Sequence, residues 1–330
     1  MFWQNLRKPF VVMAPMADVT DVAFRALVAK QGAPDVFWTE FVSADGLYHT
    51  REIQKMKDEE NPLMRDLLIG EGQRPIVAQI FSSKPEMIAY ATKLVAAKGF
   101  DGVDINMGCP DRAIERQGCG SAMIKTPEVA CAIIRAAKAA SDLPVSVKTR
   151  VGYNKESLDE WLPVLLEETP AAITLHLRTR KQMSLVPADW ELMKKAVEIR
   201  DRINPDVLLI GNGDIQNLDE ARAKIAESGC DGAMIGRGMF GNPWVFAGTS
   251  RSNLEVPQHE RTLEEKLTAL IELAHTFEKI TPPKSFAILK KHIKAFVTGF
   301  DGAAHLRAQL MELESATELE AIITQLKMQP

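Results

Sequence analysis

Gly102-Val103-Asp104-Ile105-Asn106-Met107-Gly108-Cys109-Pro110 is an apolar run that stops abruptly at a glycine, a cysteine and a proline. The part up to Ile105 predicts a buried strand, which leaves Cys109 at the carboxyl end of that strand. Parallel α/β folds keep their active sites at this end. A thiol fixed there is a candidate acid or nucleophile, and the alternative is a small buried side chain in a loop.

Similar β-rich runs recur along the chain, and helical stretches separate most of them. Eight strands that alternate with helices predict a parallel sheet, and their number predicts closure into a (β/α)8 TIM barrel. The charged run Lys55–Glu60 is interpreted as the solvated face of one further helix. The predicted strands are Phe10–Ala14, Val36–Glu40, Ile76–Ile80, Gly102–Ile105, Val145–Thr149, Ala172–His176, Val207–Ile210 and Ala233–Ile235. The predicted helices are Lys84–Lys98, Pro127–Ala140, Leu158–Glu167, Trp190–Ile203 and Asp219–Ser228.

The alternation stops after Trp244, and the residues beyond it keep helical spacing only. An apolar stripe there recurs at steps of three and four, at Leu263, Leu267, Leu270, Ala274 and Phe277. The stretch Thr249–His259, which contains Ser, Asn and Pro, is the predicted linker. We therefore expect a barrel domain over residues 1–245 and a small bundle of helices over residues 246–330.

The composition is that of an ordinary soluble globular protein. The 330 residues carry a formal net charge of −4 at pH 7, which argues against a generally basic nucleic-acid coat and permits a local basic patch. The four cysteines form no CxxC pair and have no histidine at metal-ligand spacing, so neither disulfides nor a metal site is expected. No apolar run is long enough to span a membrane. We expect a cytoplasmic monomer.

Polar side chains follow almost every predicted strand. In a closed barrel these strand ends meet at one mouth, so their side chains would face a shared ligand. The candidates are Pro15, Met16 and Ala17 after the first strand, Gln79 in the third, Asn106 and Cys109 after the fourth, Lys148 and Arg150 in the fifth, and His176 and Arg178 in and after the sixth.

Glycine-rich loops follow the last two strands. Gly211-Asn212-Gly213-Asp214 and Gly236-Arg237-Gly238 let backbone N–H groups approach an anion closely. Loops in these two positions are the usual phosphate site of such barrels. We therefore expect a phosphorylated cofactor or substrate, with Lys148 and His176 facing the rest of that ligand.

Taken in order, these blocks resemble the signature sequences of the tRNA-dihydrouridine synthases, and the resemblance extends over nearly the whole chain. It rests on Ala14-Pro15-Met16-Ala17-Asp18-Val19-Thr20-Asp21, Asn106-Met107-Gly108-Cys109-Pro110, Val147-Lys148-Thr149-Arg150, His176-Leu177-Arg178-Thr179-Arg180, Gly211-Asn212-Gly213-Asp214-Ile215 and Gly236-Arg237-Gly238. Leu177 and the bulky Met239-Phe240 depart from the family pattern. Cys119 departs too; it is interpreted as a small-residue substitution, the alternative being a second thiol near the site.

The resemblance implies an FMN, reduced by NADPH, that reduces a D-loop uridine of tRNA to 5,6-dihydrouridine. Hydride would pass to carbon 6 of the uracil, and Cys109 would donate a proton to carbon 5. A thiol pKa of about 8.5 keeps that proton in place at pH 7. Asn106 and Arg178 match the groups that hold the uracil. The implied FMN contacts are Pro15, Met16, Ala17, Gln79, Lys148 and His176, with Asn212, Gly213, Asp214, Gly236 and Arg237 on the phosphate side.

The same resemblance assigns the helical tail to tRNA binding. The predicted helix Ser285–Thr298 contains no acidic residue. Its basic side chains are Lys290, Lys291 and Lys294, and Lys284 directly precedes it. Spacing alone favours a solvated helix flank, whereas the resemblance favours a tRNA contact that Arg178 and Arg180 would extend toward the barrel mouth.

Three other interpretations stay open. An FMN barrel that reduces a small molecule, such as a dihydropyrimidine or an enoate, would share the flavin contacts without needing the basic tail. A barrel that isomerises or cleaves a sugar phosphate would purify colourless. The third is an RNA-binding chaperone with a vestigial flavin site. A yellow protein whose anaerobic NADPH oxidation depends on unmodified tRNA would separate the first assignment from all three.

Overall fold

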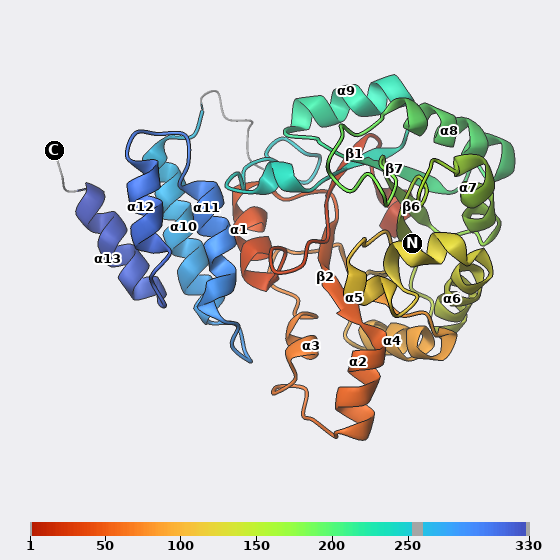
Figure 1. The fold of residues 1–330 in the computed structure, drawn as a ribbon, viewed down its shortest axis with the longest axis horizontal. Coiled ribbons are helices and arrows are strands. Elements are labelled where there is room, and N and C mark those ends of the chain that lie inside the picture. The colour runs from red at the N-terminus through yellow and green to blue at the C-terminus, as the bar shows by residue number, and fades with distance from the viewer. Residues whose placement is uncertain (1, 253–259, 328–330) are drawn as a thin grey trace.

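The computed structural model describes residues 2–252 and 260–327, and it contains a curled barrel with a helical region beside it (Figure 1). Eight parallel strands form one sheet in the order β1-β8-β7-β6-β5-β4-β3-β2. Two backbone hydrogen bonds join the edges of this sheet, from the Met13 N–H to the Val36 carbonyl (3.1 Å) and from the Asp35 N–H to the Val11 carbonyl (2.9 Å). The predicted (β/α)8 TIM barrel is therefore confirmed.

The strands lie where the apolar runs predict them, although several are longer. They are β1 (Phe10–Met13), β2 (Phe37–Ser43), β3 (Ile76–Phe81), β4 (Gly102–Met107), β5 (Val145–Arg150), β6 (Ala172–His176), β7 (Leu208–Asn212) and β8 (Gly232–Ile235). The extensions place Phe41, Asn106 and Asn212 inside strands rather than in loops. Because the strands are parallel and in register, Asn106 lies opposite Lys148, and His176 lies opposite Asn212.

Apolar side chains on both faces of the sheet explain its burial. One cluster, with Trp3, Phe10 and Trp38 as its largest members, contains no side chain from the outer helices and fills the barrel interior. The other cluster joins the outward strand residues to the surrounding helices. The interior is thus apolar toward the amino ends of the strands, and polar side chains gather at their carboxyl ends.

The helices of the barrel alternate with the strands. They are α1 (Val22–Gly32), α2 (Ala44–Tyr48), α3 (Pro62–Arg65), α4 (Pro85–Ala97), α5 (Arg112–Glu115), α6 (Pro127–Ala140), α7 (Leu158–Glu167), α8 (Glu191–Ile203) and α9 (Leu218–Ser228). Short helical turns of other types cover Phe2–Asn5, His49–Ile53, Gly120–Lys125 and Arg237–Met239. The helix predicted for Lys55–Glu60 is wrong, because Lys55 has a left-handed φ of 53° and none of these residues is helical. A turn over residues 58–60 leads to Asn61, which caps α3.

The helical region follows the barrel and packs against α1 (Figure 1). It consists of α10 (Leu263–Glu278), α11 (Lys290–Phe296), α12 (Ala303–Leu310), α13 (Ala316–Lys327) and a 3-10 turn over Phe286–Leu289. The helix predicted over Ser285–Thr298 is therefore split, with the 3-10 turn leading into α11. Residues 253–259 of the predicted linker Thr249–His259 lie outside the described residues. Every helix in the described part of the chain is too short or too polar to cross a membrane.

Candidate active site at the barrel mouth

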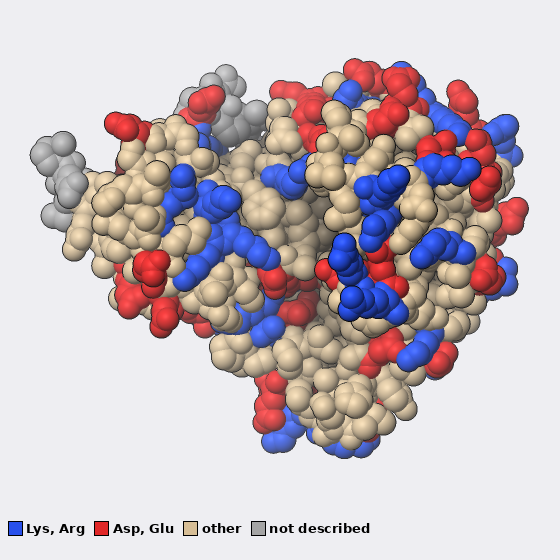
Figure 2. Space-filling view, in the orientation of Figure 1, with Lys and Arg blue, Asp and Glu red and all other residues tan. Residues whose placement is uncertain are grey.

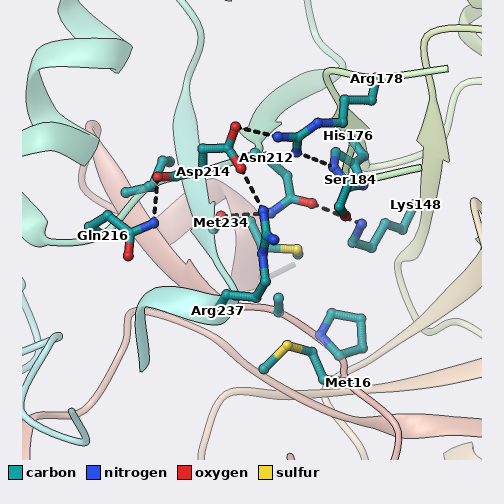
Figure 3. Close-up of a pocket in the computed structure, with 15 residues that line it drawn as sticks. Met16, Lys148, His176, Arg178, Ser184, Asn212, Asp214, Gln216, Met234 and Arg237 are labelled. Atoms are coloured by element: carbon teal, nitrogen blue, oxygen red, sulfur yellow. Dashed lines mark hydrogen bonds and ion pairs between the residues drawn. The ribbon is translucent and has the colours of Figure 1, made fainter. Parts of the chain in front are cut away.

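A cavity of about 240 Å³ opens at the carboxyl ends of β5 to β8 and β1 (Figure 3). Its polar lining comes from the predicted strand ends, namely Lys148, His176, Arg178, Asn212, Asp214 and Arg237. Pro15, Met16, Gly213 and Gly236 also line it. Residues spread over more than two hundred positions of sequence thus meet around one volume, as the barrel prediction requires.

One carboxylate holds the two arginines of this cavity. Asp214 accepts hydrogen bonds from Arg178 and from Arg237, the latter at 2.6 Å (Figure 3). Burial raises the pKa of Asp214, but hydrogen bonds from Arg178 and the Ala188 N–H outweigh it and lower the pKa below its usual value. One ionised carboxylate therefore fixes two guanidinium groups and leaves the cavity with a net positive charge.

Lys148 and His176 complete the polar wall. Lys148 Nζ donates to Asn212 Oδ1 (3.1 Å), and burial followed by the charge of Arg150 lowers the pKa of Lys148 to about 8. Burial and neighbouring cations hold the pKa of His176 well below its usual value, so the ring is neutral at pH 7. The Arg178 guanidinium can only donate, so His176 Nε2 accepts from it (3.2 Å) and Nδ1 carries the hydrogen.

A second cavity, of about 170 Å³, contains Cys109 and adjoins the first. Pro15, Lys148 and His176 line both cavities, so a single elongated ligand can extend from Arg237 to Cys109. Phe41, Gln79, Asn106 and Arg150 line this second cavity as well. The strand-end thiol that sequence reasoning singled out therefore faces the same space as the predicted cofactor contacts.

The loop that carries Cys109 is fixed from both sides. Asn106 Oδ1 accepts hydrogen bonds from the N–H groups of Gly108 (3.1 Å) and Cys109 (3.0 Å), and Arg150 Nε donates to the Gly108 carbonyl (2.7 Å). Ser121 binds the Cys109 carbonyl through both its N–H and its hydroxyl, each at 2.9 Å. Burial raises the pKa of the Cys109 thiol, so the thiol stays protonated at neutral pH.

Asn106 is oriented in turn by a chain of buried amides. Its Nδ2 donates to Gln79 Oε1 (3.1 Å), and Gln79 Nε2 donates to Asp104 (2.6 Å). Asp104 also accepts from the Ser146 hydroxyl (2.6 Å), and burial raises its pKa to about 6. A hydrogen-bonded chain thus connects the barrel interior to the thiol loop.

The two cavities fit a phosphorylated flavin. An Arg178, Arg237 and Lys148 donor set suits a phosphate, and neutral His176 and Gln79 suit uncharged polar groups of a ribityl chain and ring. Gly213 has a φ of +144°, and a Cβ added there would lie 2.5 Å from Ala188 Cβ, so only glycine keeps this loop in place. The ligand has to be elongated and anionic at one end.

The predicted tRNA contacts lie on the other side of the mouth. Lys291 and Lys294 are exposed on α11, and Lys291 reaches the barrel through an ion pair with Asp18 (3.0 Å). Lys284 does not belong to this surface: its side chain is only 3% exposed and is paired with Glu40 and Asp66. The sequence could not reveal this burial, because both partners lie more than two hundred residues away.

The sequence pattern indicates no role for two residues of the site. Arg150 is predicted only as a strand-end residue, and its side chain anchors the thiol loop. Phe41 lies one residue beyond the predicted end of the second strand at Glu40, and β2 includes it. Cys119 is 1% exposed within the apolar core, which agrees with its interpretation as a small-residue substitution.

Solved structures of low sequence identity share this fold. A "2-Naphthoyl-CoA Reductase-2-Naphthoyl-CoA complex" matches with a TM-score of 0.55 at 9% identity, over 72% of this chain and 49% of that one. Histamine dehydrogenase from Rhizobium sp. 4-9 matches with a TM-score of 0.51 at 14% identity, over 71% of this chain and 44% of that one. This chain spans about half the length of either structure.

Sequence comparison is more specific. The family model described as "Dihydrouridine synthase (Dus)" matches residues 12–329. "Probable tRNA-dihydrouridine synthase" of Staphylococcus aureus (strain MRSA252) is 39% identical over 332 residues, which cover 99% of this chain and 96% of that protein. "Probable tRNA-dihydrouridine synthase 2" of Bacillus subtilis (strain 168) is 40% identical over 324 residues, which cover 98% and 95%. The chain therefore belongs to the dihydrouridine synthase family, as its ordered signature blocks predicted.

Proposed function

We propose that this protein is an FMN-dependent tRNA-dihydrouridine synthase that uses NADPH to reduce a D-loop uridine, with Cys109 as the general acid. The observation that carries the proposal is the pair of adjoining cavities. One is lined by phosphate-binding side chains, the other by a protonated thiol, and Lys148 and His176 line both. A flavin and a base can therefore occupy neighbouring positions, as hydride transfer between them requires.

The residues of the site have separate proposed roles. Arg178, Arg237 and Lys148 would hold the phosphate and ribityl end of FMN, and the Pro15-Met16-Ala17 turn would support its ring. This places Arg178 at the cofactor rather than at the uracil, where the resemblance puts it, because Arg178 lines the first cavity and not the second. The chemistry that the bound flavin supplies is hydride transfer from NADPH to carbon 6 of the uracil. Cys109 then donates its proton to carbon 5, which completes the saturated bond and leaves a thiolate to be reprotonated from solvent.

Asn106 has two roles in this proposal. Its Oδ1 is occupied by the Gly108 and Cys109 N–H groups, so it aims the thiol. Only one of its Nδ2 hydrogens is used, by Gln79, which leaves the other hydrogen for a carbonyl of the uracil. Such a contact would place carbon 5 of the base close to the loop that carries Cys109.

The helical region would deliver the RNA. A uridine of folded tRNA is stacked or paired, so it must be extruded to reach the cavity. Exposed lysines on α11 would bind the backbone while the barrel receives the base. We propose accordingly that residues 1–245 form the FMN-binding catalytic domain and residues 246–330 the tRNA-binding domain of a cytoplasmic monomer.

A mass measurement on tRNA tests the reaction. We expect the purified yellow protein, incubated anaerobically with NADPH and tRNA from cells that lack dihydrouridine, to add two daltons to one mapped uridine. NADPH oxidation should require the tRNA, and free uridine or an enoate should not replace it. Turnover of a small molecule without RNA would instead identify a small-molecule FMN reductase, and a colourless protein would exclude both.

A further inference from the structure

Three exposed apolar side chains lie together on the β6–α8 loop, at the rim of the barrel mouth. Leu185 is 85% exposed, Met183 40% and Val186 39%, and together they make up most of the strongly exposed large apolar side chains among the described residues. We call these three residues the apolar tip. Ser184, between them, lines the cavity on the phosphate side. An exposed apolar cluster beside a binding cavity is typical of a contact surface.

The apolar tip is held in place by buried cations of the site. Arg178 Nε donates to the Val186 carbonyl (2.6 Å), and Arg150 Nη1 donates to the Met183 carbonyl (3.3 Å). Met183 has a left-handed φ of 52°, a conformation that a bulky side chain adopts only where its surroundings impose it. The loop therefore presents its apolar side chains to solvent in a fixed position relative to the cofactor cavity.

Cationic side chains lie on and beside the loop that carries the apolar tip. Lys181 and Lys125 flank Tyr153: the Lys181 N–H donates to the Tyr153 carbonyl (2.9 Å), and Lys125 Nζ lies 4.4 Å from the ring centroid. Arg180, which is paired with Glu115, connects the loop to α5. Arg112 lies on α5 and Arg116 directly follows it. The exposed cations beside the loop are therefore Arg112, Arg116, Lys125 and Lys181.

These four cations, the cationic rim, make no ion pair with another described residue, unlike the arginines of the cavity. In Figure 2, Lys and Arg side chains lie on both sides of a hollow between the helical region and the barrel, over α11 on one side and over α5 on the other. An apolar protein partner would not need this charge. A polyanion that also offers flat apolar faces would match both features, and RNA with unstacked bases is such a partner.

We propose that the apolar tip is a second RNA-contact surface, which covers the exposed faces of the tRNA bases next to the extruded uridine while the cationic rim binds their phosphates. This inference rests on the proposed function and goes beyond it, because the contact is apolar and belongs to the barrel. Extruding a base leaves its neighbours without a stacking partner. Leu185, Met183 and Val186 replace part of that lost contact.

Leu185 is the residue for the test, because its side chain is the most exposed of the three and its loss cannot open the core. The holoenzyme is compared with Leu185→Ser, with the apolar replacement Leu185→Met, and with Ile203→Ser. Ile203 is 40% exposed at the carboxyl end of α8, which leads to the amino end of β7 and so lies at the opposite face of the barrel. The probe is tRNA from cells that lack dihydrouridine, used both for binding by fluorescence anisotropy and for turnover.

We expect Leu185→Ser to lower kcat/KM for tRNA and the affinity for tRNA about tenfold, the size of one lost base contact. Leu185→Met and Ile203→Ser should stay within twofold of the wild-type protein. The slope of log K against log salt should not change in Leu185→Ser, because no phosphate contact is removed. Flavin reduction by NADPH, measured on the same preparations, separates a damaged cofactor site from an RNA effect.

Wild-type affinity and turnover in Leu185→Ser would overturn the inference, and so would an equal loss in Leu185→Met or in Ile203→Ser. Failure of the proposed function gives a different result. A protein that binds tRNA in a Leu185-dependent way but forms no dihydrouridine would overturn the proposed reaction and support the surface. A wild-type protein that binds no tRNA would overturn both.

Discussion

The barrel mouth and helix α11 both carry cations, but the two regions hold them differently. At the mouth, Arg178 has a 3% exposed side chain that is paired with Asp214, and Lys148 has a pKa lowered to about 8 by burial. On α11, Lys294 is exposed, and Lys291 is half-exposed in its pair with Asp18. The first arrangement is rigid and desolvated, and the second is solvated.

This difference separates two kinds of recognition. Desolvated, mutually hydrogen-bonded charges act at short range and select one ligand geometry, which suits a cofactor and a reacting base. Solvated lysines act over about one Debye length and weaken with salt, which suits the backbone of a large polyanion. Changes to the buried cations of the mouth should therefore affect chemistry or cofactor affinity, and changes to the lysines of α11 should affect RNA affinity alone.

The largest expected effect comes from removing the thiol. We expect Cys109→Ala to lower the rate of dihydrouridine formation by about 10²–10⁴, the usual contribution of a general acid, while FMN stays bound. The measurement is single-turnover reduction of tRNA by enzyme whose flavin has been reduced beforehand with NADPH. Cys131→Ala, which removes another partly buried thiol from α6, should react like the wild-type protein. Full activity in Cys109→Ala would remove the proposed acid.

A buried ion pair joins the helical region to the barrel, and its removal tests how much burial contributes to the energy of an ion pair in this protein. Lys284 comes from the helical region, yet its side chain is buried between Glu40 and Asp66. We expect Lys284→Met to lower the free energy of unfolding by about 3–5 kcal/mol, because an unpaired carboxylate stays buried. Urea unfolding followed by circular dichroism measures this change.

An exposed ion pair that also joins the barrel to the helical region is the control. Lys30 on α1 is paired with Glu272 on α10, and their side chains are 63% and 36% exposed. We expect Lys30→Met to change the free energy of unfolding by less than about 1 kcal/mol. Equal losses in the two variants would show that burial does not distinguish the two pairs.

Glu40 and Lys284 also show what the sequence could not predict. The strand Val36–Glu40 was ended at an acidic residue, although β2 continues to Ser43. An acid inside a buried strand is tolerated only with a partner, and this partner is 244 residues away in sequence. Local patterns carry no information on such a pairing, so the predicted strand is too short and the sequence gives no sign that Lys284 is buried.

The rest of the barrel was predictable because it depends on local signals. Apolar runs locate all eight strands to within a few residues, and parallel topology alone then brings their ends together. Cys109, Lys148 and His176 share one space for that reason. Two features of the site could not be predicted in this way: the hydrogen bond by which Arg150 anchors the thiol loop, and the hydrogen-bonded chain Asp104–Gln79–Asn106. Both depend on where side chains point, and only the folded chain determines that.

The pH dependence of FMN binding tests the buried cations of the barrel mouth. Burial lowers the pKa of Lys148 to about 8, so this ammonium group loses its proton as the pH rises above 8. We expect the affinity of the apoprotein for FMN to fall above pH 8 by up to tenfold per pH unit, because an anion binds the protonated form better. With a second pKa near 6, the FMN phosphate is about nine-tenths ionised at pH 7 and adds almost no slope above pH 8.

Quenching of FMN fluorescence between pH 7 and 9.5 measures this dependence. Lys148→Met should bind FMN more weakly at pH 7 and show a flat profile over the same range. Lys138→Met, an exposed lysine near the end of α6, should keep the wild-type profile. A wild-type profile in Lys148→Met would assign the titration to another group.

The smallest expected effect lies on α11, where solvent already screens the charges. Lys290 and Lys294 form no ion pair with another described residue, whereas Lys291 is tied to Asp18, so the first two are the cleaner pair to reverse. We expect Lys290→Glu/Lys294→Glu to weaken tRNA binding severalfold at 150 mM salt and to reduce the slope of log K against log salt by about 2, since each lost phosphate contact removes about 0.9. FMN content and its reduction by NADPH should not change.

The control is Lys93→Glu/Lys98→Glu, which makes the same charge change at two exposed lysines, one on α4 and one directly after it. If both double variants lose the same affinity, net charge rather than the position of α11 attracts the RNA, and the division between the two regions fails.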